Sequence, residues 1–257
     1  MPNTALITGA SVGIGREFAR YHASKGGDLI IVARRAEALA ALKAELEARG
    51  VKVHVIAADI GSGDAALALV HKIRALGLRI DILVNNAGFG GHGLHTERPL
   101  GDELAMIDLN VKALVVLTHE IGGDMVRQGA GRILNVSSTA GMMPGPLQAT
   151  YFATKAFVSS FSQAVDEELR EKGVTVTVLA PGPVKTEFFD KAKLNGTDLA
   201  RDARSPESVA RIGYEAMLAG KLHVINDGRL GFLLNWVVPL MPRRWPLKIA
   251  RRMQTRR

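Results

Sequence analysis

Residues 4–15 read Thr-Ala-Leu-Ile-Thr-Gly-Ala-Ser-Val-Gly-Ile-Gly, a short β-type run followed by glycines in the spacing G-x-x-x-G-x-G. A stretch predicted to be helical, near 14–25, follows directly. Glycines at such a turn let the backbone bend tightly and approach a pyrophosphate, which binds at the positive end of the helix. Glycine-rich turns often serve only packing, but the position between a first strand and a first helix favours a dinucleotide site. The candidate residues are Gly9, Ser11, Gly13, Ile14 and Gly15.

Beyond this turn, short β-type runs alternate with longer helical runs. Strands are predicted at 3–8, 28–33, 52–57, 81–85, 131–137, 174–179 and 221–225. Helices are predicted near 14–25, 36–49, 62–76, 101–128, 149–172 and 205–219. Several strands are continuously apolar, which is typical of parallel strands covered on both faces. The pattern predicts an α/β fold: a single doubly wound parallel sheet (Rossmann fold) with about seven strands and helices on both faces.

Composition excludes several classes of protein. The chain has 257 residues, of which 47% are hydrophobic and 23% charged, so it is globular rather than disordered. It contains no cysteine, which excludes disulfides, thiolate metal sites and cysteine nucleophiles.

The net charge of +8 belongs to one end of the chain. All 25 acidic residues lie at or before Asp227, and eight basic residues follow it. Residues 1–227 are therefore neutral overall, and the charge does not indicate a nucleic-acid partner. We predict one domain over 1–227 and an apolar and basic C-terminal extension over 228–257, packed on the same domain or on a partner.

The second predicted strand ends in Ala33-Arg34-Arg35, where an NAD-binding protein usually carries an acidic residue for the ribose 2′-hydroxyl. Arginine instead matches a 2′-phosphate through bidentate, charge-assisted hydrogen bonds. Both arginines can equally be solvated side chains at a helix N-terminus. Two cations at the positive end of a helix dipole are unfavourable, however, which favours a role in binding NADP(H).

Ser138, Tyr151 and Lys155 are the candidate reactive side chains. Tyr and Lys four residues apart share one helix face, and a neighbouring ammonium is expected to lower the tyrosine pKa. Such a tyrosine can act as general acid to a carbonyl or as general base to an alcohol. Ser138, at the end of the fifth predicted strand, can polarise the same oxygen. Alone, the Tyr-x-x-x-Lys spacing is weak evidence, since many surface helices carry it.

Together these motifs resemble those of the short-chain dehydrogenase/reductase family over nearly the whole chain. The stretch from Thr8 to Gly15 is similar to the family's TGxxxGIG turn, and residues 85–88 form its Asn-Asn-Ala-Gly motif. Ser138, Tyr151 and Lys155 fit its catalytic trio, with serine and tyrosine 13 positions apart. The resemblance implies that Tyr151 donates or accepts the proton and that Ser138 holds the substrate oxygen. Lys155 would bind the nicotinamide ribose and lower the pKa of Tyr151.

Other positions fit the same resemblance. Asp59 resembles the aspartate that meets the adenine, and Asn110 resembles the catalytic asparagine, which would anchor a water linking the lysine to solvent. Residues 181–186, Pro-Gly-Pro-Val-Lys-Thr, resemble the loop that cradles the nicotinamide. Some NADP-type members carry a basic residue where this chain has Val12, so selection of the 2′-phosphate falls to the two arginines. The implied cofactor-binding set is Gly9, Ser11, Gly13, Ile14, Gly15, Arg34, Arg35, Asp59, Asn86, Ala87, Gly88, Tyr151, Lys155, Pro181, Gly182, Val184 and Thr186.

The loops after the fourth, fifth and sixth strands carry apolar residues, which suggests an apolar substrate pocket. The candidates are Phe89, Met142, Met143, Leu147, Phe188 and Phe189. A hydrophobic ketone, aldehyde or acyl chain fits such a pocket better than a sugar acid, although half of these residues can instead pack the loops onto the domain. His92 and His95 flank the pocket without further ligands at metal-binding spacing, so no metal is expected and both are predicted to be solvated loop histidines.

The C-terminal extension allows two interpretations. Trp245, Ile249 and Met253 share one face of a predicted helix rich in basic residues, which suits a membrane interface with anionic lipid. We favour the alternative, a segment that closes the pocket or packs on a partner subunit, because it is short and interrupted by prolines. No secretory signal or membrane-spanning run is visible, so a cytoplasmic location is expected. The helices at 101–128 and 149–172 resemble those that build dimers or tetramers in the family, although both can be core.

The sequence therefore predicts an NADP-dependent oxidoreductase. It would transfer a hydride between the nicotinamide and a carbonyl or secondary alcohol of an apolar substrate, in the reductive direction. A non-catalytic nucleotide-binding regulator on the same fold is a second reading, against which the intact catalytic set argues. A membrane-associated lipid or acyl reductase is a third.

Overall fold

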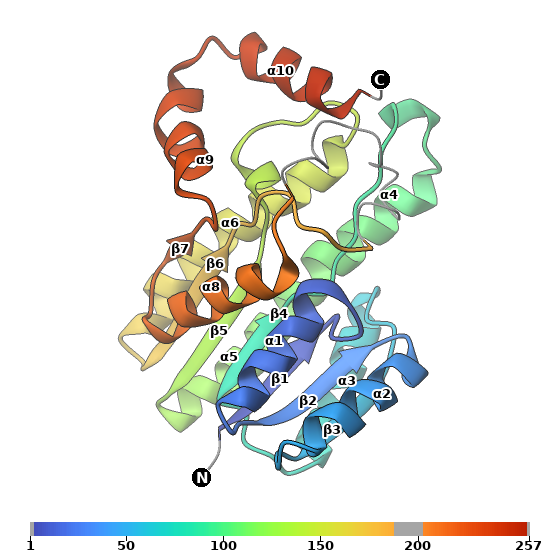
Figure 1. Ribbon diagram of the computed structural model, residues 1–257, viewed down its shortest axis with the longest axis vertical. Coiled ribbons are helices and arrows are strands. Elements are labelled where there is room, and N and C mark those ends of the chain that lie inside the picture. Colours follow the sequence, from blue (N-terminus) through green and yellow to red (C-terminus); the bar gives the residue numbers. More distant parts are fainter. Residues whose placement is uncertain (1–2, 188–202, 256–257) are drawn as a thin grey trace.

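The computed structural model describes residues 3–187 and 203–255 (Figure 1). Its centre is one parallel sheet with the strand order β3-β2-β1-β4-β5-β6-β7. The strands are β1 (Thr4–Thr8), β2 (Asp28–Ala33), β3 (Val53–Ala57), β4 (Ile82–Asn85), β5 (Gly131–Val136), β6 (Val174–Leu179) and β7 (His223–Val224). The predicted doubly wound sheet is confirmed, and the strand order reverses between β1 and β4, where such sheets bind ligands.

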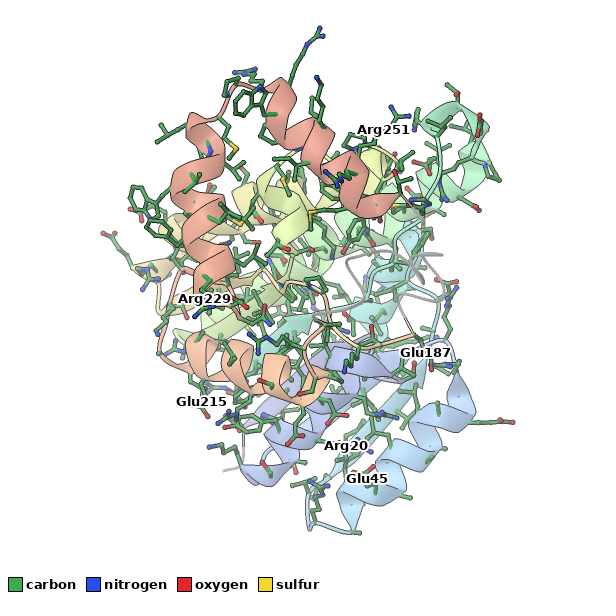
Figure 2. All side chains as sticks on the ribbon, turned by 45° about the horizontal axis from the view of Figure 1, so that its top comes forward. Arg20, Glu45, Glu187, Glu215, Arg229 and Arg251 are labelled. Carbon is green, nitrogen blue, oxygen red and sulfur yellow. The ribbon has the colours of Figure 1, made fainter. Side chains whose placement is uncertain are left out.

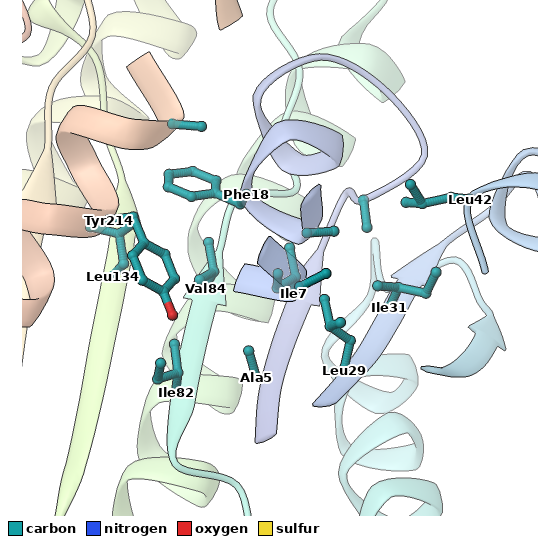
Figure 3. Packing of buried hydrophobic residues seen from close by; sticks show 14 of the residues in the cluster. Ala5, Ile7, Phe18, Leu29, Ile31, Leu42, Ile82, Val84, Leu134 and Tyr214 are labelled. Carbon is teal, nitrogen blue, oxygen red and sulfur yellow. The ribbon is translucent and has the colours of Figure 1, made fainter. Parts of the chain in front are cut away.

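Helices cover both faces of this sheet. One layer consists of α1 (Gly13–Ser24), α2 (Ala36–Glu47) and α8 (Pro206–Leu218). The other consists of α3 (Gly63–Ala75), α5 (Leu114–Gln128) and α6 (Ala149–Arg170). Successive strand residues point to opposite faces, so Ala5 and Ile7 pack against the first layer while Leu6 packs against the second. Figure 3 shows the first of these cores, where Phe18 of α1 and Tyr214 of α8 meet the sheet.

The segment predicted as one helix over 101–128 is divided. An α-helix, α4 (Leu100–Ile107), leads into a π-helical turn at Asp108–Ala113, and α5 follows. A π-helical turn widens the backbone spiral and shifts the side chains after it, a feature common at functional sites. Asn110 lies within this turn and is buried, 2% exposed.

The C-terminal extension arches over the carboxyl ends of the strands (Figure 1). Helix α9 (Gly228–Phe232) continues through further helical turns at Leu233–Val237 and Val238–Leu240, and α10 (Arg244–Gln254) follows after a bend. Across the described residues, no helix has both the length and the apolar character needed to cross a bilayer.

Thr8 ties the ends of β1 and β4 together. Its hydroxyl donates to the Val84 carbonyl at 3.3 Å and accepts from the backbone N–H groups of Asn86 and Ala87, each at 3.1 Å. The side chain is 1% exposed, so water cannot replace these contacts. The hydroxyl therefore sets where the chain leaves β4 at the point of strand reversal.

Replacing Thr8 with Val keeps the shape of the side chain and removes the hydroxyl. We expect the free energy of unfolding to fall by about 1–3 kcal/mol, because two partly buried N–H groups lose their acceptor. Thr4→Val on the same strand is the matched control, since the Thr4 hydroxyl bonds to no described residue. Urea unfolding measures both variants, and equal stabilities would contradict the role given to Thr8.

Candidate active site

A cavity of about 420 Å³ lies over the carboxyl ends of the strands. Arg34 and Asp59, after β2 and β3, line one end, and Tyr151 and Phe152 of α6 line the other. Most of the predicted cofactor and catalytic residues meet in this one space. Gly15 and Asn110 stand behind the lining, while Met142 and Leu147, predicted for the substrate pocket, do not line it.

The glycine turn brings the backbone of β1 close to the loop after β4. Gly9 and Gly13 have left-handed backbone angles, with φ of +67° and +56°. A Cβ atom on Gly9 would lie 2.7 Å from the Asn86 side-chain nitrogen, and one on Gly15 would lie 2.3 Å from the Gly9 carbonyl oxygen. No described side chain caps α1, whose first turn faces the cavity at Gly13 and Ile14. The backbone N–H groups there remain available to an anion.

Two arginines line the cavity at the edge formed by β2 and β3. Arg34 lies 3.6 Å from the Asp59 carboxylate, and both side chains are largely exposed. Arg35 lies 3.3 Å from the Glu187 carboxylate. Exposed ion pairs of this kind contribute little to stability, so both guanidiniums can reorient towards a stronger anion at low cost.

Ser138, Tyr151 and Lys155 come together at the other end of the cavity. Helical spacing places Tyr151 and Lys155 on the buried face of α6, with the lysine nitrogen 5.9 Å from the tyrosine ring centre. That nitrogen donates to the Val136 carbonyl at 2.9 Å. Ser138 follows β5, accepts a hydrogen bond from the Ala140 N–H at 3.1 Å and hydrogen-bonds with Tyr151. The neighbouring Ser137 instead donates to the Lys155 carbonyl at 2.7 Å and holds α6 against β5.

Burial dominates the titration of this pair. It raises the pKa of Tyr151 to about 12, while the hydrogen bond with Ser138 acts in the opposite direction. Burial also lowers the pKa of Lys155 to about 8. The expected lowering of the tyrosine pKa is therefore not found in this cavity, because desolvation of the phenolate outweighs the favourable contacts. At neutral pH Tyr151 is protonated and placed to donate.

Asn110 supports the site from behind. Its side-chain nitrogen donates to the Phe89 carbonyl at 2.9 Å, and its oxygen accepts from the Phe89 N–H at 3.1 Å. The same nitrogen is 3.1 Å from the Thr154 hydroxyl of α6. A Cβ on Gly88 would lie 2.9 Å from the Asn110 oxygen and 3.5 Å from the Lys155 nitrogen, so only glycine leaves this approach open. Asn110 thus fixes the loop after β4 relative to the helix that carries Tyr151 and Lys155.

A buried polar chain, which sequence reasoning missed, holds α6 in place. The Asn85 side-chain nitrogen donates to Asn135 on β5 at 2.9 Å and to Thr118 on α5 at 3.1 Å. Asn135 in turn donates to the Ser162 hydroxyl of α6 at 2.8 Å. Asparagine in an otherwise apolar strand was the available signal. These hydrogen bonds hold α6 in one position, because a shift of the helix would leave buried polar groups without their partners.

The end of the cavity that Tyr151 and Phe152 line is apolar. Of the predicted pocket residues, Phe89 and Met143 line it, and both pack on a small cluster with Tyr151 and Phe152. Phe188 and Phe189 lie outside the described residues. The C-terminal extension adds Leu230, Leu234 and Met253. Leu230 and Leu234 were missed because an apolar run does not show which of its sides faces inward. Met253 was predicted to share a face with Trp245 and Ile249, but of these three only Met253 lines the cavity.

The extension is fastened to this end by hydrogen bonds. The Gln148 side chain, in the cavity wall, donates to the Gln254 side-chain oxygen at 2.7 Å. His92, predicted to be a solvated loop residue, hydrogen-bonds to the Gln254 carbonyl at 2.9 Å. His95 remains exposed and lies 3.6 Å from the Glu103 carboxylate. Within the described residues, no group of three or more His, Asp or Glu side chains is arranged to hold a metal ion.

Comparison with known proteins gives a consistent family signal. A family model described as short chain dehydrogenase matches residues 3–195. A sulfoacetaldehyde reductase of Chromohalobacter salexigens is 41% identical over 207 residues, covering 79% of this chain and 80% of that protein. A 3-oxoacyl-acyl-carrier-protein reductase of Synechocystis sp. is 37% identical over 239 residues, covering 89% of this chain and 97% of that protein.

Solved structures share the architecture as well. A short-chain dehydrogenase from Sphingobium yanoikuyae in complex with NADPH superposes with a TM-score of 0.82 at 29% identity. The match covers 95% of this chain and all of the other.

The buried lysine predicts a pH dependence of stability that needs no ligand. Because burial lowers the pKa of Lys155 to about 8, the unfolded chain binds more protons than the folded protein between that value and the ordinary lysine pKa of 10.5. The contribution of Lys155 to stability therefore increases with pH across this window.

Lys155→Met removes the buried charge. Its unfolding free energy relative to wild type should fall by on the order of 1–3 kcal/mol between about pH 7 and about pH 10. Lys52→Met, at an exposed lysine, should show no such change, and parallel curves for Lys155→Met in urea unfolding would contradict the assignment.

Proposed function

The chain belongs to the short-chain dehydrogenase family, and we propose that it is an NADP(H)-dependent reductase of apolar ketones and aldehydes. One observation carries the proposal. A protonated tyrosine, a serine hydroxyl and a buried lysine meet at the apolar end of a cavity whose other end carries two arginines. This arrangement suits a bound dinucleotide with a carbonyl substrate beside it.

The residues of the cavity fit NADP(H). The open first turn of α1 and the close approach at Gly9 leave room for the backbone to meet a pyrophosphate. Arg34 and Arg35 would hold the 2′-phosphate, and Lys155 would hold the nicotinamide ribose. When bound, NADPH supplies the hydride that reduces the carbonyl carbon. The NADPH complex of the Sphingobium yanoikuyae protein supports this choice of cofactor.

Tyr151 would supply the proton. Its pKa of about 12 keeps the phenol protonated at neutral pH, so it can donate to a carbonyl oxygen as negative charge develops there. Ser138 would donate a second hydrogen bond to the same oxygen. Lys155 has a pKa of about 8, so it is mostly cationic at neutral pH and can stabilise the phenolate left after the transfer. These states favour the reductive direction.

The substrate class follows from the lining beyond Tyr151. Phe89, Met143, Leu230 and Leu234 offer apolar contacts. Among the described lining residues, the cations are Arg34, Arg35 and Lys155, all assigned above to the cofactor. A sulfonated aldehyde like the substrate of the Chromohalobacter salexigens relative would therefore find no further counter-ion among the described lining residues, whereas an alkyl or acyl ketone would not need one. Of the two relatives, the 3-oxoacyl reductase is the better guide.

A homo-oligomer is the proposed assembly. Leu104 of α4 is 51% exposed and Phe157 of α6 is 39% exposed, so both helices present apolar side chains to solvent. Pairing these helices between two copies would bury them.

Tyr151→Phe tests the proton donor. With NADPH and the best substrate from a panel of medium-chain ketones and aldehydes, kcat should fall by about 10²–10⁴-fold while the Kd for NADPH stays within about threefold. Tyr21→Phe is the matched control, since the Tyr21 hydroxyl bonds to Glu215 away from the cavity. A Phe variant with the kcat of the wild type would refute the role, and a wild type inactive on the whole panel would refute the substrate class.

Arg34→Ala tests the cofactor. The ratio of kcat/KM with NADPH to kcat/KM with NADH should fall by about 10- to 100-fold, because a charge-assisted hydrogen bond to the phosphate is lost. Arg49→Ala, which removes an exposed arginine beyond α2, should leave the ratio unchanged. If Arg34→Ala also leaves it unchanged, the phosphate contact belongs to Arg35 instead.

A further inference from the structure

The outer surface of the C-terminal extension is apolar although it faces solvent. Trp236 is 68% exposed, Leu240 is 86% exposed and Trp245 is 61% exposed, and Phe232 and Ile249 are also exposed. The same segment buries Leu234, Ala250 and Gln254 against the domain. Packing on the domain therefore does not account for the outer residues. Large exposed apolar side chains gathered on one segment indicate an interaction site.

The exposed apolar residues form stripes. Phe232, Trp236 and Leu240 are spaced four residues apart along the first helical segment, as are Trp245 and Ile249 on α10. On an α-helix, residues at that spacing lie on one face, as Trp245 and Ile249 do on α10. Phe232, Trp236 and Leu240 follow one another through an α-helical, a π-helical and a 3-10 turn, and all three are exposed. Figures 1 and 2 show both segments at the end of the molecule opposite the amino ends of the strands. The surface formed by these residues is called the outer face below.

Cations border the outer face. Arg244, Lys248, Arg251 and Arg252 are exposed on α10, and Figure 2 marks Arg251 towards the end of that helix. None of the four has an ion-pair partner within residues 3–187 and 203–255. No acidic residue follows Asp227 in the sequence, so nothing on the extension offsets their charge.

We propose that the outer face docks this protein onto the surface of an anionic lipid bilayer. Exposed tryptophans beside lysines and arginines match an interface where apolar side chains enter the headgroup region and cations meet lipid phosphates. A second copy of the chain is a poorer occupant. Symmetric pairing of two outer faces would bring two sets of unpaired cations together, and like charges in an interface are repulsive. The extension lacks a helix able to span the membrane among the described residues, so the contact is peripheral.

Docking would place the substrate end of the cavity next to the bilayer. Leu230, Leu234 and Met253 line the cavity from the inner side of the same extension. One segment would then separate lipid from the reacting groups. The docking itself does not depend on the proposed reductase activity, so the test below uses no turnover.

The protein carries its own reporter. The chain has two tryptophans, and both lie on the outer face. Vesicles of phosphatidylcholine with about 30% phosphatidylglycerol should shift tryptophan emission to shorter wavelength and pull the full chain down on sedimentation, whereas phosphatidylcholine alone should bind it at least about tenfold more weakly. Brominated phosphatidylcholine in the mixed vesicles should quench the emission. Added NaCl should release the protein, because salt screens the attraction.

Two variants locate the contact. Replacing Arg244, Lys248, Arg251 and Arg252 together with Gln should weaken partitioning by about 10²–10³-fold, at about fivefold per cation. The matched control replaces Lys52, Lys72, Lys172 and Lys221 with Gln; these are exposed, carry the same charge and lie towards the amino ends of the strands. Leu240→Ser with Ile249→Ser should reduce the emission shift while keeping both tryptophans. Leu67→Ser with Leu76→Ser, at exposed leucines of α3 and its end, is the control for that pair.

Several results would overturn the proposal. Absence of both sedimentation and an emission shift with the wild type would do so without any variant. If the variant without the four α10 cations and its lysine control lost vesicle binding equally, the attraction to the anionic lipid would lie elsewhere on the protein. An emission shift that grows with protein concentration in the absence of vesicles, with a larger mass in sedimentation velocity that Leu240→Ser and Ile249→Ser abolish, would assign the outer face to a second copy instead.

Discussion

The Thr8 hydroxyl is the contact on which the geometry of the cavity depends. Neighbouring strands β1 and β4 send the chain to opposite faces of the sheet, which opens a gap between their ends. From the end of β1, the Thr8 hydroxyl bonds across that gap to the backbone at the end of β4, and the Asn86 side chain donates back to the Thr8 carbonyl at 3.0 Å. This exchange succeeds only because Gly9 has no Cβ to displace Asn86. Because the gap keeps this width, the loop after β4 places Gly88 next to Asn110 and Lys155.

The end of the cavity that holds Tyr151 and Lys155 is stabilised by contacts that offset the unfavourable burial of these two side chains. Tyr151 and Lys155 share the inner face of α6, and desolvation opposes the charged form of each. Their positions persist because α6 is fixed elsewhere, through Ser162 to Asn135 and through the Lys155 carbonyl to Ser137. The stabilising contacts of α6 thus lie away from the Tyr151 hydroxyl and the Lys155 ammonium, which lets the fold keep these side chains in a buried position that desolvation disfavours.

Much of this architecture was predictable from local sequence, because it follows from periodicity. The parallel sheet rests on apolar runs, the turn at residues 8–15 on glycine, and the pairing of Tyr151 with Lys155 on helical spacing. Other features depend on contacts distant in sequence. The π-helical turn at Asn110 interrupts a segment whose composition is helical throughout, and the pKa of Tyr151 reflects burial that no spacing reveals. Met142 and Leu147 were predicted to line the cavity and do not, because an apolar loop residue can pack on the domain as readily as line a cavity.

In the C-terminal extension, sequence is least able to predict which apolar residues face inward, because part of the segment is apolar on all sides. Over residues 230–240, hydrophobicity alone does not distinguish inner from outer positions. On α10, which follows that run, inner and outer positions are distinguished by Gln254, which is 1% exposed and bonds to Gln148, because this contact sets the rotation of the helix about its axis. With Gln254 turned inward, Ala250 follows it one helical turn earlier, and Trp245 and Ile249 must face out. A polar contact at the apolar end of the cavity therefore determines which apolar side chains of α10 the protein presents at its surface.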